Sequence, residues 1–84
     1  MLEARVYVIM KPGVLDPQGK AVKSALDSLG FEGLKDVRVG KYFAIKLDDI
    51  SKEKAVERLK GMCEKLLANP VIEDYKIEIL DIKS

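Results

Sequence analysis

The chain has 84 residues, and its 15 basic and 14 acidic side chains leave a formal net charge of +1. A chain of this length forms one small domain with a modest core, and so low a net charge does not favour binding to nucleic acid or to an anionic membrane. One cysteine and no histidine exclude an internal disulfide and disfavour a zinc site, so a partner chain is the remaining way to reinforce the core.

The sequence shows neither a bilayer-spanning segment nor a secretory signal, so we expect a cytoplasmic protein. The longest apolar run of the chain, Val6 to Met10, is far too short to span a bilayer. No basic segment precedes a long apolar one, so a secretory signal is not expected. We expect residues 1–84 to form a single domain.

Residues 3–11 alternate between two faces, which predicts a first strand. One face carries Ala4, Val6, Val8 and Met10, and the other is also partly apolar, with Tyr7 and Ile9. Pro12 and Gly13 end this strand, because proline has no amide to donate to a sheet.

A helix is predicted to begin after Asp16, which is a favoured N-cap residue, with Pro17 in the first helical position. Its buried stripe consists of Val22, Ala25, Leu26 and Leu29, at helical spacing. Gly30 is the expected C′ glycine, and Phe31 can fold back on Leu26.

The middle stretch, residues 36–47, has the longest alternating pattern and predicts the central strand of the sheet. Its core face is formed by Val37, Val39, Phe43, Ile45 and Leu47. The alternation breaks at Gly40 and Lys41, which indicates either a bulge or a tight turn.

A second, longer helix is predicted after the N-cap residue Ser51 and before Asn69 and Pro70. Its apolar stripe consists of Val56, Leu59, Met62, Cys63, Leu66 and Leu67. The last strand is predicted from about Val71 to Ile82. Tyr75, Ile77 and Ile79 share one of its faces, and Lys76, Glu78 and Leu80 share the other.

This order of elements predicts an α+β fold, a two-layer sandwich in which two helices cover one face of a mainly antiparallel sheet. If Gly40 and Lys41 form a turn, the order is βαββαβ, as in ferredoxin-like folds. If they form a bulge, one long bent strand takes the place of two.

Residues with catalytic chemistry are scarce, and we expect no catalytic, cofactor-binding or metal-binding residues. Without histidine there is no imidazole base, and Cys63 lies in an apolar helix stripe, where a thiol is usually structural. The stretch from Gly13 to Lys20 resembles a phosphate-binding loop, but five residues instead of four separate its glycines, and Ala21 replaces the serine or threonine.

The sheet face without helices is predicted to contact another protein, because a solvated face would be more polar. Lys41 is included because a charge that interrupts the apolar pattern suits a partner or a turn. The interface candidates are Tyr7, Ile9, Arg38, Lys41, Tyr42, Ala44 and Leu80. We expect a homodimer or homotetramer, with no binding of nucleic acid or membrane.

Three stretches together resemble the PurS family, the small subunits of phosphoribosylformylglycinamidine synthase. They run from Lys11 to Val22, from Asp36 to Lys41 and from Cys63 to Tyr75. The resemblance implies a non-catalytic assembly subunit of an ATP- and glutamine-dependent ligase of purine biosynthesis.

The same resemblance implies which partners and cofactors the complex has. A PurQ-type glutaminase would release ammonia, and a PurL-type synthetase would use it, with this chain bridging the two and aiding ammonia transfer. ATP, Mg and glutamine would be used by the complex and not bound by this subunit. The alternative is an oligomeric regulatory domain that senses a small molecule.

Overall fold

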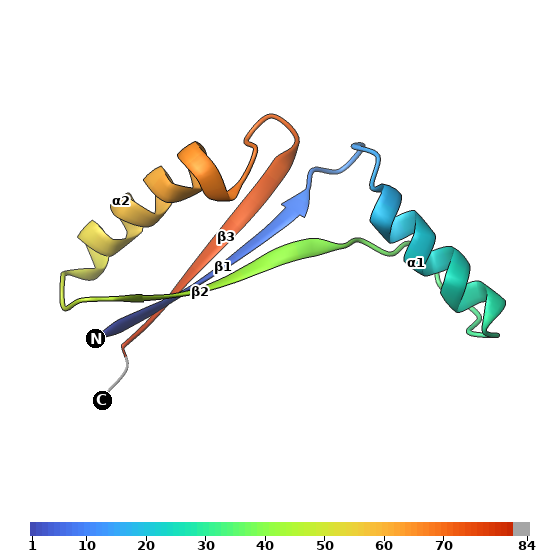
Figure 1. Ribbon diagram of the computed structural model, residues 1–84, viewed down its shortest axis with the longest axis horizontal. Coiled ribbons are helices and arrows are strands. Elements are labelled where there is room, and N and C mark those ends of the chain that lie inside the picture. Colours follow the sequence, from blue (N-terminus) through green and yellow to red (C-terminus); the bar gives the residue numbers. More distant parts are fainter. Residues whose placement is uncertain (82–84) are drawn as a thin grey trace.

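The structure is a computed structural model, and it describes residues 1–81. It contains β1 (Leu2–Met10), α1 (Pro17–Ser28), β2 (Gly40–Leu47), α2 (Lys52–Met62), the π-helical turn η1 (Cys63–Leu67) and β3 (Glu73–Asp81) (Figure 1). The predicted α+β class, with an antiparallel sheet and two helices, is confirmed. The last residue of the predicted final strand, Ile82, lies outside the described residues.

The sheet has the order β2-β1-β3, and both pairings are antiparallel. The prediction that the middle stretch forms the central strand is therefore wrong, because β1 pairs on both sides and β2 is an edge. Alternation reports that one face of a strand is buried, and it does not report how many neighbours the strand has. The partly apolar second face of β1 was the better indication of a central position.

Gly40 and Lys41 form neither a turn nor a bulge, because β2 begins at Gly40 and pairs without interruption, with Gly40 opposite Ile9 and Lys41 opposite Val8. A Cβ atom at position 40 would lie 2.2 Å from the carbonyl oxygen of Val8. Only glycine therefore allows β2 to begin this close to β1. The preceding residues 31–39 have no regular secondary structure.

The core lies between one face of β1 and the helix that precedes β3. Its fully packed members are Ala4, Val6, Val8, Leu59, Cys63 and Ala68. Half-buried side chains of β2 and β3 surround them, including Phe43 and Ile77. The predicted inward faces of β1 and β3 are thus confirmed.

One member of the predicted α2 stripe, Leu66, is 84% exposed. The chain forms a π-type turn there, which is wider than an α-helical turn, and the amide of Ala68 donates to the carbonyl of Cys63 at 3.0 Å. The extra residue in this turn rotates Leu66 away from the sheet, so the stripe ends earlier than a regular helix would place it.

The predicted ends of α1 are confirmed. At its start, the Asp16 side chain accepts a hydrogen bond from the amide of Gly19, and Pro17 is the first helical residue. At its end, Gly30 has a φ of +94°, and the amide of Phe31 donates to the carbonyl of Leu26. These are the hydrogen bonds that a helix start and a Schellman end require.

The position of α1 corrects the prediction of two helices on one sheet face. Only α2 packs on the sheet, and α1 lies beyond its end, joined by a turn in residues 11–16 and by the irregular segment 31–39 (Figure 1). Most of the stripe expected to be buried is exposed in the single chain, with Val22 at 40% and Leu29 at 73%, and only Leu26 is half-buried. The spacing was correct, but a helical stripe does not specify which surface covers it.

Two alanine substitutions should change stability in opposite directions. A Cβ at Gly19 would lie 2.1 Å from the carbonyl oxygen of Val37, whereas a Cβ at Gly61 would meet nothing within 4 Å. We expect Gly19→Ala to lower the free energy of unfolding by about 1–3 kcal/mol through overpacking. Gly61→Ala should raise it by about 0.5–1 kcal/mol through helix propensity. Urea denaturation measures both, and equal effects would show that α1 does not lie this close to residue 37.

Candidate protein-interaction surface and the junction beside it

The sheet face opposite α2 has no helix on it, and we call it the open face. It is formed by the alternate residues of the three strands that do not point into the core. The strand register brings together Glu3, Arg5, Tyr7, Ile9, Tyr42, Ala44, Lys46, Asp74, Lys76, Glu78 and Leu80. Five of the seven predicted interface residues therefore lie on one continuous surface: Tyr7, Ile9, Tyr42, Ala44 and Leu80.

Two tyrosines form the middle of the open face. Tyr7 and Tyr42 are opposite each other across β1 and β2, with ring centroids 5.2 Å apart and ring planes tilted by 38°. Partial burial, followed by the nearby Glu78 carboxylate, raises the pKa of Tyr7. Tyr7 therefore remains neutral at physiological pH, and the two rings present an aromatic surface with a hydroxyl edge.

Arg5 adds a cation next to the tyrosines on the central strand. Its Nη2 atom lies 3.4 Å from Glu3 Oε2, and its Nε atom is buried with no hydrogen-bond partner among residues 1–81. A partly exposed guanidinium beside exposed tyrosines and within a charged rim is typical of a surface that binds another protein.

The other two interface candidates lie elsewhere. Lys41 is on the α2 side of β2, where its Nζ atom is 3.9 Å from Glu73 Oε2. Arg38 belongs to the segment that leads from α1 into β2, outside the sheet. The contacts of these two residues with a partner stay predictions, on surfaces separate from the open face.

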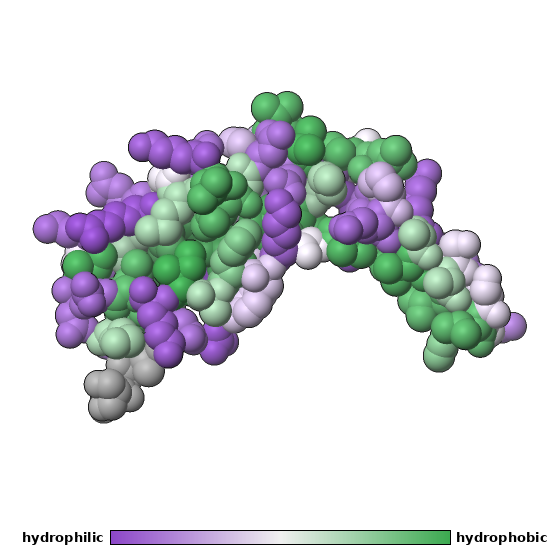
Figure 2. Space-filling view, in the orientation of Figure 1, coloured by the Kyte–Doolittle hydropathy of each residue, from purple (hydrophilic) through white to green (hydrophobic). Residues whose placement is uncertain are grey.

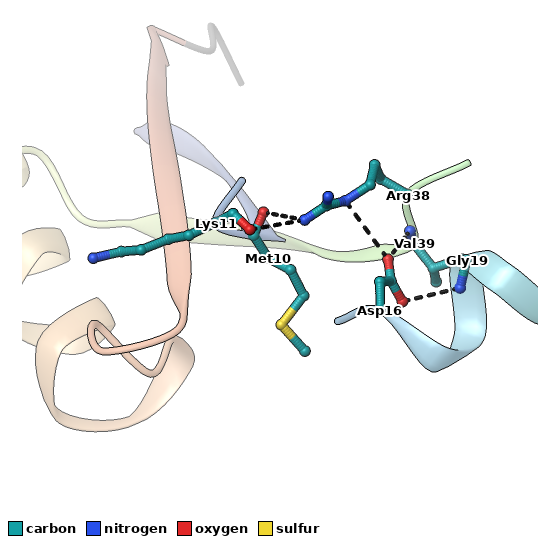
Figure 3. Close-up of polar contacts among 6 residues, drawn as sticks. All are labelled: Met10, Lys11, Asp16, Gly19, Arg38 and Val39. Carbon is teal, nitrogen blue, oxygen red and sulfur yellow. Dashed lines mark hydrogen bonds and ion pairs between the residues drawn. The ribbon is translucent and has the colours of Figure 1, made fainter. Parts of the chain in front are cut away.

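Arg38 and Asp16 form a junction that joins α1 to the end of the sheet (Figure 3). Asp16 accepts hydrogen bonds from the amides of Gly19 and Val39, each with a donor–acceptor distance of 2.9 Å. Arg38 Nη2 donates to the carbonyls of Met10 and Lys11 at distances of 2.8 and 3.0 Å. The Nε atom of Arg38 lies 3.9 Å from Asp16 Oδ2. Three segments that are distant in the sequence are thereby held together.

The Asp16 carboxylate is the electrostatic centre of this junction. The amides of Gly19 and then Val39, with Arg38 nearby, hold the pKa of Asp16 below its ordinary value. The side chain is buried, although aspartate usually stays at the surface. Sequence reasoning identified its role as a cap but missed its bond to Val39, since no local spacing rule links residues 16 and 39.

The structure offers little for covalent or metal chemistry in the described residues. Cys63 is fully buried, and burial followed by the Glu64 charge raises the pKa of its thiol, so the reactive thiolate is disfavoured. No group of metal-ligating side chains is found between residues 1 and 81. Within the same range, no helix is long and apolar enough to span a membrane.

Removal of the Asp16 carboxylate should destabilise the chain more than removal of an ordinary cap. Ser51 caps α2 through one hydrogen bond, which its hydroxyl accepts from the amide of Lys54 at 3.2 Å. Ser51→Ala should therefore lower the free energy of unfolding by about 1 kcal/mol. Asp16→Ala loses two amide bonds and the Arg38 charge partner, and should lower the denaturant midpoint further. Equal midpoints for the two variants would contradict the second role of Asp16.

Comparison with known proteins gives the family of this chain. A family model described as PurS, phosphoribosylformylglycinamidine (FGAM) synthase, matches residues 3–81. The phosphoribosylformylglycinamidine synthase subunit PurS of Bacillus subtilis is 46% identical over 82 residues, which are 98% of this chain and 96% of that protein. The same subunit of Methanocaldococcus jannaschii is 42% identical over 83 residues, or 99% of this chain and 100% of the relative.

Solved structures agree with this relationship. The crystal structure of Methanocaldococcus jannaschii PurS has a TM-score of 0.88 at 42% identity and covers 99% of this chain and 100% of its own. A structure described as PurLQS from Thermotoga maritima has a TM-score of 0.82 at 34% identity, covering 95% of this chain and 99% of that one. On both sequence and fold, the chain belongs to the PurS family of phosphoribosylformylglycinamidine synthase subunits.

Proposed function

We propose that this chain is the non-catalytic assembly subunit of phosphoribosylformylglycinamidine synthase, which bridges the glutaminase and synthetase subunits and aids the transfer of ammonia between them. The observation that carries the proposal is the full-length match to PurS subunits, one of which belongs to a structure described as PurLQS. The activity belongs to the assembled ATP- and glutamine-dependent ligase, in the de novo synthesis of purines.

The open face is the surface we assign to the larger subunits. Its combination of Tyr7, Tyr42 and Arg5 within a rim of mixed charge resembles the composition of interfaces between proteins that also exist apart, in which aromatic residues and arginine are enriched. A wholly aliphatic patch would instead favour a permanent interface. The Arg5 side chain, which is 40% exposed, provides a cation for a carbonyl or carboxylate of the partner.

An assembly subunit accelerates the overall reaction by proximity. Ammonia that escapes into solvent is diluted, and most of it is protonated at neutral pH, which removes the lone pair needed for attack. A subunit that holds two active sites in one complex replaces the bulk concentration of ammonia by a much higher local concentration. This role requires binding surfaces and no catalytic residue in the small subunit.

The remaining assignments follow from the same proposal. ATP, Mg and glutamine are used by the PurL-type and PurQ-type subunits, and the complex works in the cytoplasm. The small chain itself is a homodimer or homotetramer, because a domain of this size has little core of its own. The alternative function, a regulatory domain that senses a small molecule, receives no support from the related proteins.

A reconstitution assay tests the proposed function. The chain alone should neither hydrolyse glutamine nor consume ATP. Mixed with its synthetase and glutaminase partners, it should be required for glutamine-dependent product formation. Ammonium salt supplied to the synthetase should make the chain much less necessary, because free ammonia bypasses the coupling of two active sites. Full glutamine-dependent activity without this chain would refute the assembly role.

A substitution on the open face should separate assembly from folding. Tyr42 is 54% exposed, so Tyr42→Glu should leave the urea midpoint nearly unchanged while it lowers glutamine-dependent activity at least about tenfold, as for a loss of about 1.4 kcal/mol at an interface. Arg58→Gln, on the exposed side of α2, lowers the net charge by the same one unit and should retain activity. Equal activity of the two variants would show that the open face is not the contact surface.

A further inference from the structure

A chain that bridges two different proteins needs two binding surfaces that do not overlap. The open face is formed by eleven residues of the three strands, whereas a standard interface uses about 20–30 residues on each side. The open face therefore has room for one of the two larger subunits and not for both. The other subunit requires a second surface on the same small chain.

The segment 66–72, which joins η1 to β3, carries the most exposed large apolar side chains in residues 1–81. Leu66 is 84% exposed and Val71 is 80% exposed. Figure 2 shows apolar side chains at the outer surface of the connection between α2 and β3. Because η1 continues α2, this segment belongs to the side of the sheet that lies opposite the open face (Figure 1).

The backbone of this segment is held in one conformation by hydrogen bonds around Asn69. The carbonyl of Asn69 accepts from the amides of Ile72 and Glu73 at 3.1 and 2.7 Å. The side-chain oxygen of Asn69 accepts from the amide of Val71 at 3.1 Å, and the amide of Asn69 donates to Glu73 Oε1 at 2.7 Å. A segment that is ordered before binding loses little conformational entropy when a partner binds it.

The exposure of Leu66 results from the π-type turn that precedes this loop. A regular helix would have kept Leu66 in the buried stripe, and π-type turns occur frequently at functional sites. The turn is also tied to the sheet, because the hydroxyl of Tyr75 on β3 donates to Glu64 Oε1 at 3.0 Å. The turn and the loop after it therefore present two aliphatic side chains on a fixed backbone.

The segment 66–72 contains no charged residue, although 35% of the residues in the chain are charged. The open face, in contrast, carries charged side chains on all three strands. A charge that faced Leu66 or Val71 in an interface would lose its water without gaining a partner. The surface that fits this segment is therefore an uncharged apolar pocket. The exposed side of α2 does not offer an equivalent site, because lysine and glutamate predominate there and both are depleted at interfaces.

We propose that the segment 66–72 inserts Leu66 and Val71 into an uncharged apolar pocket of one larger subunit of the synthase, while the open face binds the other larger subunit. This inference rests on the proposed function and refines it, since it divides the two larger subunits between two surfaces. The two surfaces lie on opposite sides of the sheet, so both subunits can be bound at once.

Binding of each purified larger subunit to the full-length small chain tests this division. Leu66→Asp and Val71→Asp should each weaken binding of the same one subunit at least about tenfold, because a carboxylate is disfavoured in an apolar pocket. Binding of the other subunit should stay unchanged, and Tyr42→Glu should show the reverse pattern. Ser24→Asp, which adds the same charge at an exposed position of α1, should leave both unchanged. Salt at about 1 M should weaken the contact that depends on Tyr42 more than the one that depends on Leu66.

The outcomes separate this inference from the proposed function. A parent chain that binds neither larger subunit would refute the proposed function itself. Parent binding with no effect of either aspartate, or loss of the same subunit with Leu66→Asp and with Tyr42→Glu, would overturn only the division between two surfaces. A lower mass of the free Val71→Asp chain in light scattering would also overturn it, since a second copy would then cover the segment. Urea midpoints identify a variant that fails to fold, and the other aspartate variant then decides.

Discussion

The direction of α1 depends on one carboxylate. Both oxygens of Asp16 are used, one to cap the helix through Gly19 and the other to hold the amide of Val39. Arg38 extends the same network to the carbonyls at the end of β1. Because buried ionised groups are stable only when their partners are in place, the network permits one geometry of strand end, helix start and return segment.

That geometry explains why many apolar side chains of the sheet are only half-buried or exposed. With α1 held beyond the sheet, α2 alone covers the core face, and the side chains of Phe43 and Ile45 stay half-buried. The open face receives no helix either, and its tyrosines remain in contact with solvent. The polar junction of Asp16 and Arg38 therefore determines which apolar surfaces of the chain are left exposed.

The elements of this fold could be predicted because their signals are local. The caps at Asp16 and Ser51 and the glycine end at Gly30 depend on hydrogen bonds between residues a few positions apart, and each was found where the sequence indicated it. The alternation along β1 and β3 likewise identified their inward faces. Such patterns describe a segment together with its immediate neighbours.

What could not be predicted depends on contacts between distant segments. The alternation of the middle stretch did not distinguish an edge strand from a central one, and the stripe of α1 did not specify its covering surface. The position of Leu66 depended on a π-type turn that has no sequence signal of its own. For the candidate site, strand period was enough to gather Tyr7, Tyr42 and three others on one face, but not to place Arg38 and Lys41.

The two edges of the sheet differ in a way that limits how the protein can grow. β3 carries five charged residues in nine, namely Glu73, Asp74, Lys76, Glu78 and Asp81, whereas β2 carries two in eight. A strand so rich in charge resists pairing with a further strand, because each added neighbour would crowd like charges and bury ionised groups. Of the two edges, β2 is therefore the one less protected against pairing with a further strand.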